Sequence, residues 1–226
     1  MSDIAAVDCT ERWLDVRFAS AQRVLSWAIV GGGLRQSDAV VWHYVRREEL
    51  PLGRDPVALF ESRLHERGLA DAVGLLTARD LLPYVDVAAE HSGVRARCIA
   101  TVGLGNALRT GDPPAAGPSV GTINLLCHLS RPLGELAMLE ALALTAEART
   151  AALLERDVPS VVSGQPATGT GTDCNVVACP LAGTPEPYAG KHTVVGHLVG
   201  QVVAAAVGRA TDGWLDEMAA ATDRST

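Results

Sequence analysis

Residues 122–156 read TINLLCHLSRPLGELAMLEALALTAEARTAALLER, and this stretch contains the two kinds of element that determine the fold. Residues 122–129 form a short apolar run that predicts a buried strand. Residues 133–156 then predict the longest helix of the chain, because Ser130 can cap its start and Pro132 suits its first turn. The neighbouring segments can be assigned from this strand and helix outward.

The same criteria predict the remaining elements on both sides. Strands are predicted, in chain order, over residues 23–30, 39–45, 73–78, 85–90, 94–102 and 175–179, and helices over residues 56–67 and 194–207. Several strands come first, and their short connections favour antiparallel pairs. The pattern therefore predicts an α+β fold, with a mixed, largely antiparallel sheet packed with helices in a single compact domain.

Length and composition limit the number of domains and the classes of partner. The chain has 226 residues, 48% of them hydrophobic, which suits one domain over residues 1–226 with a core at about 23–208 and a polar tail after Met218. A net charge of −7 and 4% aromatic residues argue against nucleic acid and an anionic membrane as partners. We see no signal peptide and no uninterrupted apolar span, so we expect a cytoplasmic protein.

The cysteines and histidines predict no metal site and no disulfide framework. The cysteines are odd in number and form no Cys-x-x-Cys pair: Cys9, Cys98, Cys127, Cys174 and Cys179. Cys174 and Cys179 lie at odd spacing on one predicted strand, so their side chains should point to opposite faces. The six histidines show no metal-binding spacing. We expect reduced and mostly buried thiols.

The segment at residues 163–173, SGQPATGTGTD, is the least ordinary part of the chain. Its candidate residues are Thr168, Gly169, Thr170, Gly171, Thr172 and Asp173. The two glycines can adopt φ > 0 and approach a ligand closely, and the threonines add hydroxyl groups. Such a loop can present backbone N–H groups to a developing negative charge, as an oxyanion site does. The alternative is a tight turn whose hydroxyls cap their own backbone.

Three charged or titratable residues are candidates for proton transfer. Glu147 lies among alanines and leucines on the long helix, where a raised pKa would suit a general acid or base. The alternative is an edge residue of an amphipathic helix, paired with Arg149 or Lys191. Lys191 and His192 are predicted to begin the last helix, against the helix dipole, which indicates either an anionic partner or solvent exposure.

Asparagines and glycines at predicted strand ends are candidates for substrate binding. Asn106 and Asn124 could hold a substrate through their amides, or could be a turn former and a satisfied sheet amide. Gly32 and Gly33 could admit a ligand or turn the chain, and they lack the spacing of a Rossmann cofactor site. Residues 109–119, rich in proline, could form an exposed excursion or a mobile flap.

These segments, in this order, resemble the adenosylcobinamide amidohydrolase family. The matching motifs lie at residues 24–34, 73–78, 100–104, 121–124, 145–150, 167–173 and 188–191. The resemblance extends from about residue 24 to about residue 207, and the ordered set is more specific than any one motif. The sequence departs from the family pattern at Arg149, where lysine is frequent, and at Cys174, where small residues are common.

The resemblance implies hydrolysis of adenosylcobinamide to adenosylcobyric acid and 1-amino-2-propanol, in corrinoid salvage or cobamide remodelling. It implies no cofactor bound by the protein, because the substrate carries its own cobalt in the corrin ring. We expect Asp173 or Glu147 to activate water, residues 168–172 to hold the oxyanion, and Lys191 or His192 to protonate the leaving amine. A covalent route through Thr170, Thr172 or Cys174 is less favoured, since no histidine partner is evident.

Two other functions remain open at this point. One is a corrinoid-binding protein without hydrolysis, and the other is an amidase for smaller amides. The protein could also form a homo-oligomer, because the small residues of the last predicted helix, at 200–208, allow close packing with another subunit.

Overall fold

One strongly curved sheet of eight strands organises the residues that the computed structural model describes, which are 4–51, 53–114 and 121–224. The strands are β1 (Ile4–Cys9), β2 (Trp13–Ser26), β3 (Gly33–Tyr44), β4 (Val73–Thr77), β5 (Val85–His91), β6 (Val94–Val102), β8 (Ile123–Leu129) and β10 (Cys174–Pro180). Their order is β4-β3-β2-β10-β8-β6-β5, and β1 pairs with β2. A separate ribbon pairs β7 (Ala107–Leu108) with β9 (Gly169–Thr170).

Antiparallel pairs predominate, and two parallel pairs make the sheet mixed. The parallel pairs are β8 with β10 and β3 with β4. The helices are α1 (Pro56–Glu66), α2 (Glu135–Leu154) and α3 (Val194–Asp223), with a short 3-10 turn η1 (Arg47–Glu49). This arrangement confirms the predicted α+β fold with a largely antiparallel sheet packed with helices.

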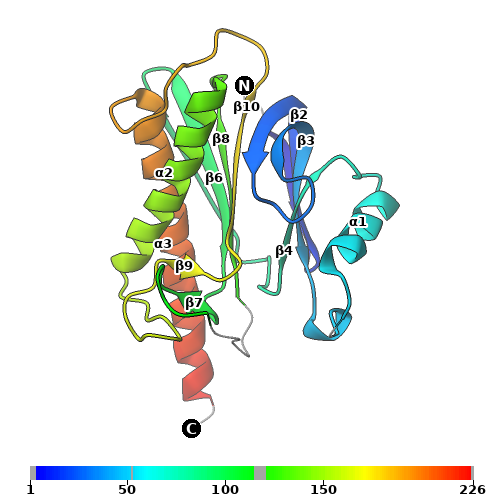
Figure 1. Ribbon diagram of the computed structural model, residues 1–226, viewed down its shortest axis with the longest axis vertical. Coiled ribbons are helices and arrows are strands. Elements are labelled where there is room, and N and C mark those ends of the chain that lie inside the picture. Colours follow the sequence, from blue (N-terminus) through cyan, green and yellow to red (C-terminus); the bar gives the residue numbers. More distant parts are fainter. Residues whose placement is uncertain (1–3, 52, 115–120, 225–226) are drawn as a thin grey trace.

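The helices cover different parts of the sheet. Figure 1 shows α2 and α3 side by side against the part of the sheet that contains β6 and β8, while α1 lies beyond β3 and β4. Alternate side chains of β6 and β8, such as Cys98 and Leu125, enter the core beneath α2 and α3. The opposite, concave face buries a second core that includes Ile99 and Trp42, and Phe60 of α1 anchors a third cluster. Because the sheet is curved, strands that are not neighbours in its order lie around the same opening.

Several predicted boundaries differ from the structure. The strand predicted at 23–30 is the second half of β2, which begins at Trp13 and ends at Ser26, and β1 was not predicted. Helix α2 begins after Gly134 rather than after a Ser130 cap. Helix α3 begins at Val194 and continues to Asp223, so the residues after Met218 are helical.

Helix α3 extends further than predicted because its second half has partners. Arg79, in the β4–β5 connection, donates to both carboxylate oxygens of Glu217 at 2.6 Å. Part of the small-residue stretch at 200–208 packs within the chain: a Cβ added to Gly208 would lie 2.6 Å from Nη2 of Arg156, whereas one added to Gly200 would meet nothing within 4 Å. The homo-oligomer stays a prediction. This α3 is long and apolar enough to cross a membrane by length and composition, contrary to the expectation from sequence, but 61% of its apolar window is buried inside the protein.

The cysteines take the places expected from their spacing. All five are free thiols, and four of them are buried. Cys174 joins the core on the concave face, whereas Cys179 joins the core beneath α2 and α3. The two side chains therefore point to opposite faces of β10, as predicted.

Candidate functional site

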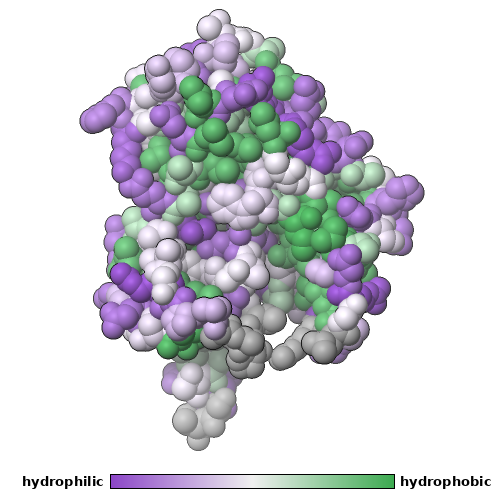
Figure 2. Space-filling model, viewed as in Figure 1, coloured by the Kyte–Doolittle hydropathy of each residue, from purple (hydrophilic) through white to green (hydrophobic). Residues whose placement is uncertain are grey.

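A pocket of about 420 Å³ opens where the first residues of β8 and β10 meet the end of β2. The register explains this meeting, since Cys174 pairs with Asn124 across the parallel strands and Val176 pairs with Ser26 across the antiparallel ones. Figure 2 shows a hollow between the half of the molecule that contains β3, β4 and α1 and the half that contains β8 and α2. Curvature of the sheet thus produces a concave site at strand ends.

The two halves contribute different chemistry to the pocket lining. The half with β3, β4 and α1, together with the β2–β3 connection, contributes mainly apolar side chains: Trp27, Ile29, Val45, Leu50, Pro56 and Leu75. The half with β8 and β10 contributes mainly polar groups: Asn106, Thr122, Asn124, Thr172 and Asp173. A ligand with an apolar body and a polar end would match this division.

Asp173 is the one carboxylate among the described residues that line the pocket. Its Oδ2 accepts from Nη1 of Arg149 at 2.9 Å and from the backbone N–H of Thr170 at 2.9 Å. Its Oδ1 accepts from the Thr170 hydroxyl at 2.5 Å and from the N–H of Ile123 at 3.2 Å. Burial raises the pKa of Asp173, and the positive charge of Arg149 and the hydrogen bonds to Thr170 and Ile123 oppose that rise.

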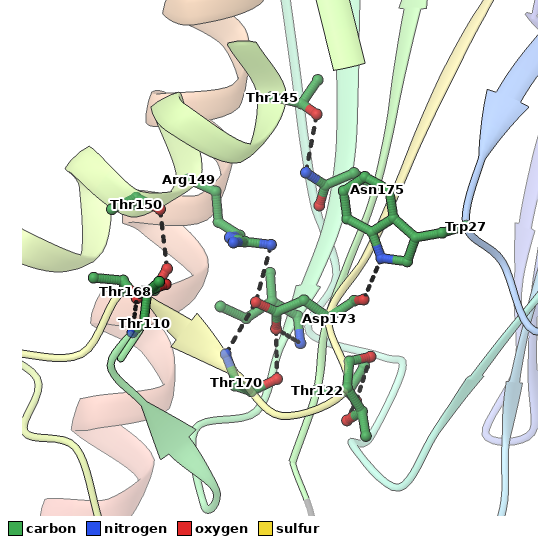
Figure 3. Close-up of polar contacts among 12 residues, drawn as sticks. Trp27, Thr110, Thr122, Thr145, Arg149, Thr150, Thr168, Thr170, Asp173 and Asn175 are labelled. Carbon is green, nitrogen blue, oxygen red and sulfur yellow. Dashed lines mark hydrogen bonds and ion pairs between the residues drawn. The ribbon is translucent and has the colours of Figure 1, made fainter. Parts of the chain in front are cut away.

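Helix α2 holds the Asp173 loop through three side chains (Figure 3). Thr145 accepts from Nδ2 of Asn175 at 2.9 Å, Arg149 pairs with Asp173, and Thr150 donates to the carbonyl of Thr168 at 3.0 Å. The Arg149–Asp173 pair is shielded, with side chains 12% and 8% exposed. The motif at 145–150 therefore acts as a clamp on the loop and on the start of β10.

Polar groups inside the pocket are arranged around two threonines and two asparagines. The hydroxyls of Thr122 and Thr172 form a short hydrogen bond, and Thr172 also donates to the carbonyl of Gly121 at 3.0 Å. Nδ2 of Asn124 donates to the carbonyl of Leu76 at 3.1 Å, which ties β8 to β4 across the opening. Oδ1 of Asn106 is buried and has no hydrogen-bond partner among the described residues. This free acceptor suits a donor on a ligand.

The Gly-Thr loop, at residues 168–173, differs from the oxyanion site that the sequence predicts, because its donors contact a side chain of the loop itself. Neither Gly169 nor Gly171 adopts a positive φ. Gly169 is required for space, because a Cβ there would lie 2.3 Å from Oδ2 of Asp173. The loop does present an N–H and a hydroxyl, both from Thr170, to a negative charge, but that charge belongs to Asp173. Of the three threonines of the loop, only Thr172 belongs to the described lining of the pocket. The hydroxyl of Thr168 forms hydrogen bonds with the backbone N–H and the hydroxyl of Thr110.

The structure brings together two of the other predicted catalytic residues, away from the pocket lining. Nζ of Lys191 forms a short ion pair with Oε1 of Glu147, and their side chains are 65% and 57% exposed. Lys191 and His192 precede α3, whose cap is Thr193, and His192 is exposed. Among the described residues, the pocket lining includes none of these three. The pairing of Glu147 with Lys191 confirms the alternative that the sequence left open.

We expect the substitutions Glu147→Gln and Lys191→Met each to change the free energy of unfolding by less than about 1 kcal/mol, because exposed ion pairs contribute little. Turnover should also stay within about twofold of the wild type, since neither side chain lines the pocket. Thermal unfolding and steady-state kinetics of the two variants measure both quantities. A hundredfold drop in turnover for Glu147→Gln would contradict this and would show that the carboxylate takes part in catalysis.

Other residues take positions that the sequence did not assign to a site. Gly32 lies in the β2–β3 connection, which contributes Trp27 and Ile29 to the pocket, and Gly33 is the first residue of β3. Neither glycine is part of the described lining. Nε1 of Trp27 donates to the carbonyl of Asp173 at 2.6 Å. The apolar alternation of β2 gave no sign of this contact, which depends on the pairing with β10. Residues 115–119 of the predicted flap lie outside the described residues.

Cys174 lines the pocket, but its environment disfavours a thiolate. Burial, and to a lesser degree the charge of Asp173, raises the pKa of this thiol to about 12. The group is therefore protonated through the neutral range and reacts slowly as a nucleophile.

We expect Cys174→Ala to retain turnover within about threefold, and we expect alkylation of Cys174 by iodoacetamide at pH 8 to be much slower than that of free cysteine. Rapid alkylation with matched loss of activity would contradict this.

Comparison with known proteins adds a family to this geometry. A family model described as adenosylcobinamide amidohydrolase matches residues 2–219. A protein of Halobacterium salinarum named adenosylcobinamide amidohydrolase is 37% identical over 122 residues, which are 49% of this chain and 49% of that protein. The chain thus spans about half the length of the curated relative that it matches. A solved structure, the PH0078 protein from Pyrococcus horikoshii OT3, aligns over 91% of this chain and 78% of its own, with 11% identity and a TM-score of 0.48.

Proposed function

Because the chain belongs to the adenosylcobinamide amidohydrolase family, we propose that it hydrolyses the amide bond between aminopropanol and the corrin ring of adenosylcobinamide. The products would be adenosylcobyric acid and 1-amino-2-propanol, and the reaction would serve corrinoid salvage or cobamide remodelling in the cytoplasm. The single observation that carries the chemistry is a pocket in which one buried carboxylate, Asp173, lies beside amide and hydroxyl groups.

Binding of the amide can be assigned to the polar half of the pocket. Oδ1 of Asn106, which has no hydrogen-bond partner within the part of the chain that the structure describes, accepts the N–H of the substrate amide. The hydroxyls of Thr122 and Thr172, already paired with each other, lie in the same lining and turn toward the carbonyl oxygen as negative charge develops there. The backbones of these residues are held by the loop and by β8, so the change needed in the transition state is confined to rotation of a hydroxyl group.

Asp173 is assigned to proton transfer. A carboxylate has about four lone-pair sites, and in Asp173 all four are occupied. The longest contact, 3.2 Å from the N–H of Ile123 to Oδ1, is the one that a water molecule displaces most easily. Asp173 then takes a proton from that water as its oxygen adds to the carbonyl carbon, and returns the proton to the amine as the C–N bond breaks. Lys191 and His192 lie outside the described lining, so this scheme gives them no step.

Protein-bound metal has no part in this scheme, since cobalt belongs to the substrate. The described residues contain no cluster of three or more His, Cys, Asp or Glu side chains that could hold a metal ion. The positive charge near the reacting groups is supplied by Arg149, which stabilises the ionised form of Asp173.

One assay tests the proposal against its two alternatives. Purified protein is incubated with adenosylcobinamide, and adenosylcobyric acid and 1-amino-2-propanol are measured by mass spectrometry. Hydrolysis supports the proposal. Saturable binding of the corrinoid without release of aminopropanol would indicate a corrinoid-binding protein, and turnover of simple amides with no activity on adenosylcobinamide would indicate a smaller-amide hydrolase.

A further inference from the structure

Three large apolar side chains are exposed around the β2–β3 connection. Trp27, Ile29 and Leu34 are 47%, 38% and 48% exposed. Leu34 of β3 pairs with Leu25 of β2 across the hairpin, so these two side chains lie on the same side of the hairpin. Leu25 is two residues before Trp27. Large exposed apolar side chains that cluster next to a pocket are a mark of ligand binding rather than of an ordinary surface. We call Trp27, Ile29 and Leu34 the apolar platform.

The apolar platform continues into the pocket. Trp27 and Ile29 belong to its lining, and Leu34 lies on β3 just beyond the connection that carries them, paired with Leu25 of β2. Figure 2 shows a hydrophobic surface next to the hollow, on the half of the molecule that contains β3, β4 and α1. The volume of about 420 Å³ fits a side chain of moderate size. A corrin macrocycle with its peripheral amides is larger than this and has to remain at the mouth, where apolar surface is exposed.

The connection that carries Trp27 and Ile29 is held against β4, and Trp27 joins it to the reactive end of the pocket. The indole N–H of Trp27 donates to the carbonyl of Asp173, which fixes the ring at one edge (Figure 3). Gly31 adopts φ +67°, and a Cβ there would also lie 2.9 Å from the carbonyl of Ala72, so the connection is packed against β4. A ligand on the exposed ring face would therefore contact a residue that also positions the backbone of Asp173.

From these contacts we propose that the apolar platform binds the corrin macrocycle, while the aminopropanol side chain enters the pocket. Trp27 has two roles in this arrangement: its ring contacts the macrocycle, and its N–H positions Asp173. The inference rests on the proposed function, and it assigns to Trp27, Ile29 and Leu34 the discrimination between a corrinoid and a smaller amide.

The test separates the two roles of Trp27 with matched variants. Binding is measured with adenosylcobyric acid, which carries the macrocycle but no amide bond to aminopropanol, by equilibrium dialysis read from corrinoid absorbance. We expect Trp27→Ala to raise the Kd about tenfold or more and Leu34→Ala to raise it about threefold to tenfold. Leu139→Ala, at an apolar residue of α2 that is 57% exposed, is the control and should bind as the wild type does.

Kinetics with adenosylcobinamide then address the positioning role. Trp27→Phe keeps an apolar ring and removes the N–H donor, so we expect kcat to fall about tenfold while KM stays within about twofold. An effect on KM alone would overturn the positioning role. Circular dichroism and thermal unfolding confirm that each variant is folded.

Failure of this inference differs from failure of the proposed function. If Trp27→Ala and Leu34→Ala bind adenosylcobyric acid as tightly as the wild type, the platform is wrong even if the protein hydrolyses adenosylcobinamide. If the wild type binds the corrinoid without hydrolysis and the platform variants lose binding, the platform stands and the hydrolytic function fails. Absence of corrinoid binding by the wild type overturns both.

Discussion

Asp173→Asn is expected to lower turnover of adenosylcobinamide by about 10²- to 10⁴-fold, which is the usual contribution of a positioned general base. The variant also leaves Arg149 without a counter-charge and places an amide N–H₂ group where the structure has only donors: Arg149, Thr170 and Ile123. Removal of one partner of a shielded ion pair costs about 3 kcal/mol of folding free energy. The protein should therefore be less stable but still folded.

The measurements for Asp173→Asn are single-turnover kinetics at a temperature well below its unfolding midpoint, together with thermal unfolding. Asp212→Asn is the matched control, because Asp212 also pairs with an arginine, Arg156, at 2.6 Å, but its side chain is 54% exposed. That control should lose less than about 1 kcal/mol and keep full activity. Equal turnover in the two variants would show that Asp173 is not the general base.

The pH dependence of the wild type gives an independent check on Asp173. A base must be ionised, and burial raises the pKa of this carboxyl above its ordinary value. As the pH falls through the raised pKa, Asp173 gains a proton and kcat/KM should fall, on the acid side of the profile and at a higher pH than for an ordinary aspartate. Thermal unfolding over the same pH range is the control. Because the pKa of Asp173 is raised in the folded state, protonation of this carboxyl should not lower the free energy of unfolding, so the fall in kcat/KM should occur while the protein stays folded.

Gly169→Ala is expected to be the most damaging small substitution in the Gly-Thr loop. The new Cβ would lie 2.3 Å from Oδ2 of Asp173 and 3.2 Å from Nη2 of Arg149, so it would push apart the pair that α2 and the loop form. Asp173 has a short side chain held by four contacts and cannot turn away without losing some of them. We expect a loss of about 1–3 kcal/mol in stability and at least about a tenfold fall in kcat.

Gly171→Ala in the same loop is the matched control. A Cβ at Gly171 would have Leu108 Cδ1 at 3.4 Å and Asn106 Nδ2 at 3.8 Å as its nearest neighbours, which are ordinary contacts. This variant should unfold within about 0.5 kcal/mol of the wild type and keep most of its activity. If the two alanine variants behave alike, the space occupied by Asp173 is not the reason for a glycine at position 169.

The sequence predicted most elements because each has a local pattern. The strand at 122–129 and the helix at 133–156 both appear, with the helix shorter than predicted by two residues at each end. The first half of β2 was missed, although Leu14, Val16 and Phe18 alternate and all enter the concave core. The polar residues that follow, and the shift in register between Arg17 and Gln22, hid the continuity of a strand that bends.

The site could be predicted only in part. Its loop is one continuous stretch of sequence, whereas the side chains that contact this loop come from distant positions in the chain. The Thr-Gly-Thr-Gly-Thr-Asp loop stood out by composition, and Asp173 and Thr172 do line the pocket. The partner of Asp173 is Arg149, which lies 24 residues earlier, and only packing of α2 against β10 brings them together. Helical periodicity separates Glu147 from the residues that hold the loop, since Glu147 lies two residues after Thr145 and two before Arg149 and so on the opposite side of the helix.

The clamp formed by α2 also limits which changes in chain length the protein tolerates. Thr145, Arg149 and Thr150 reach Asn175, Asp173 and Thr168 from one helix, within six consecutive residues. Insertion of a single residue after Thr145 would rotate everything beyond it by about 100°. Arg149 and Thr150 would then leave their partners together, so deletions and insertions should be far more harmful here than in the surface turn at Ser92-Gly93.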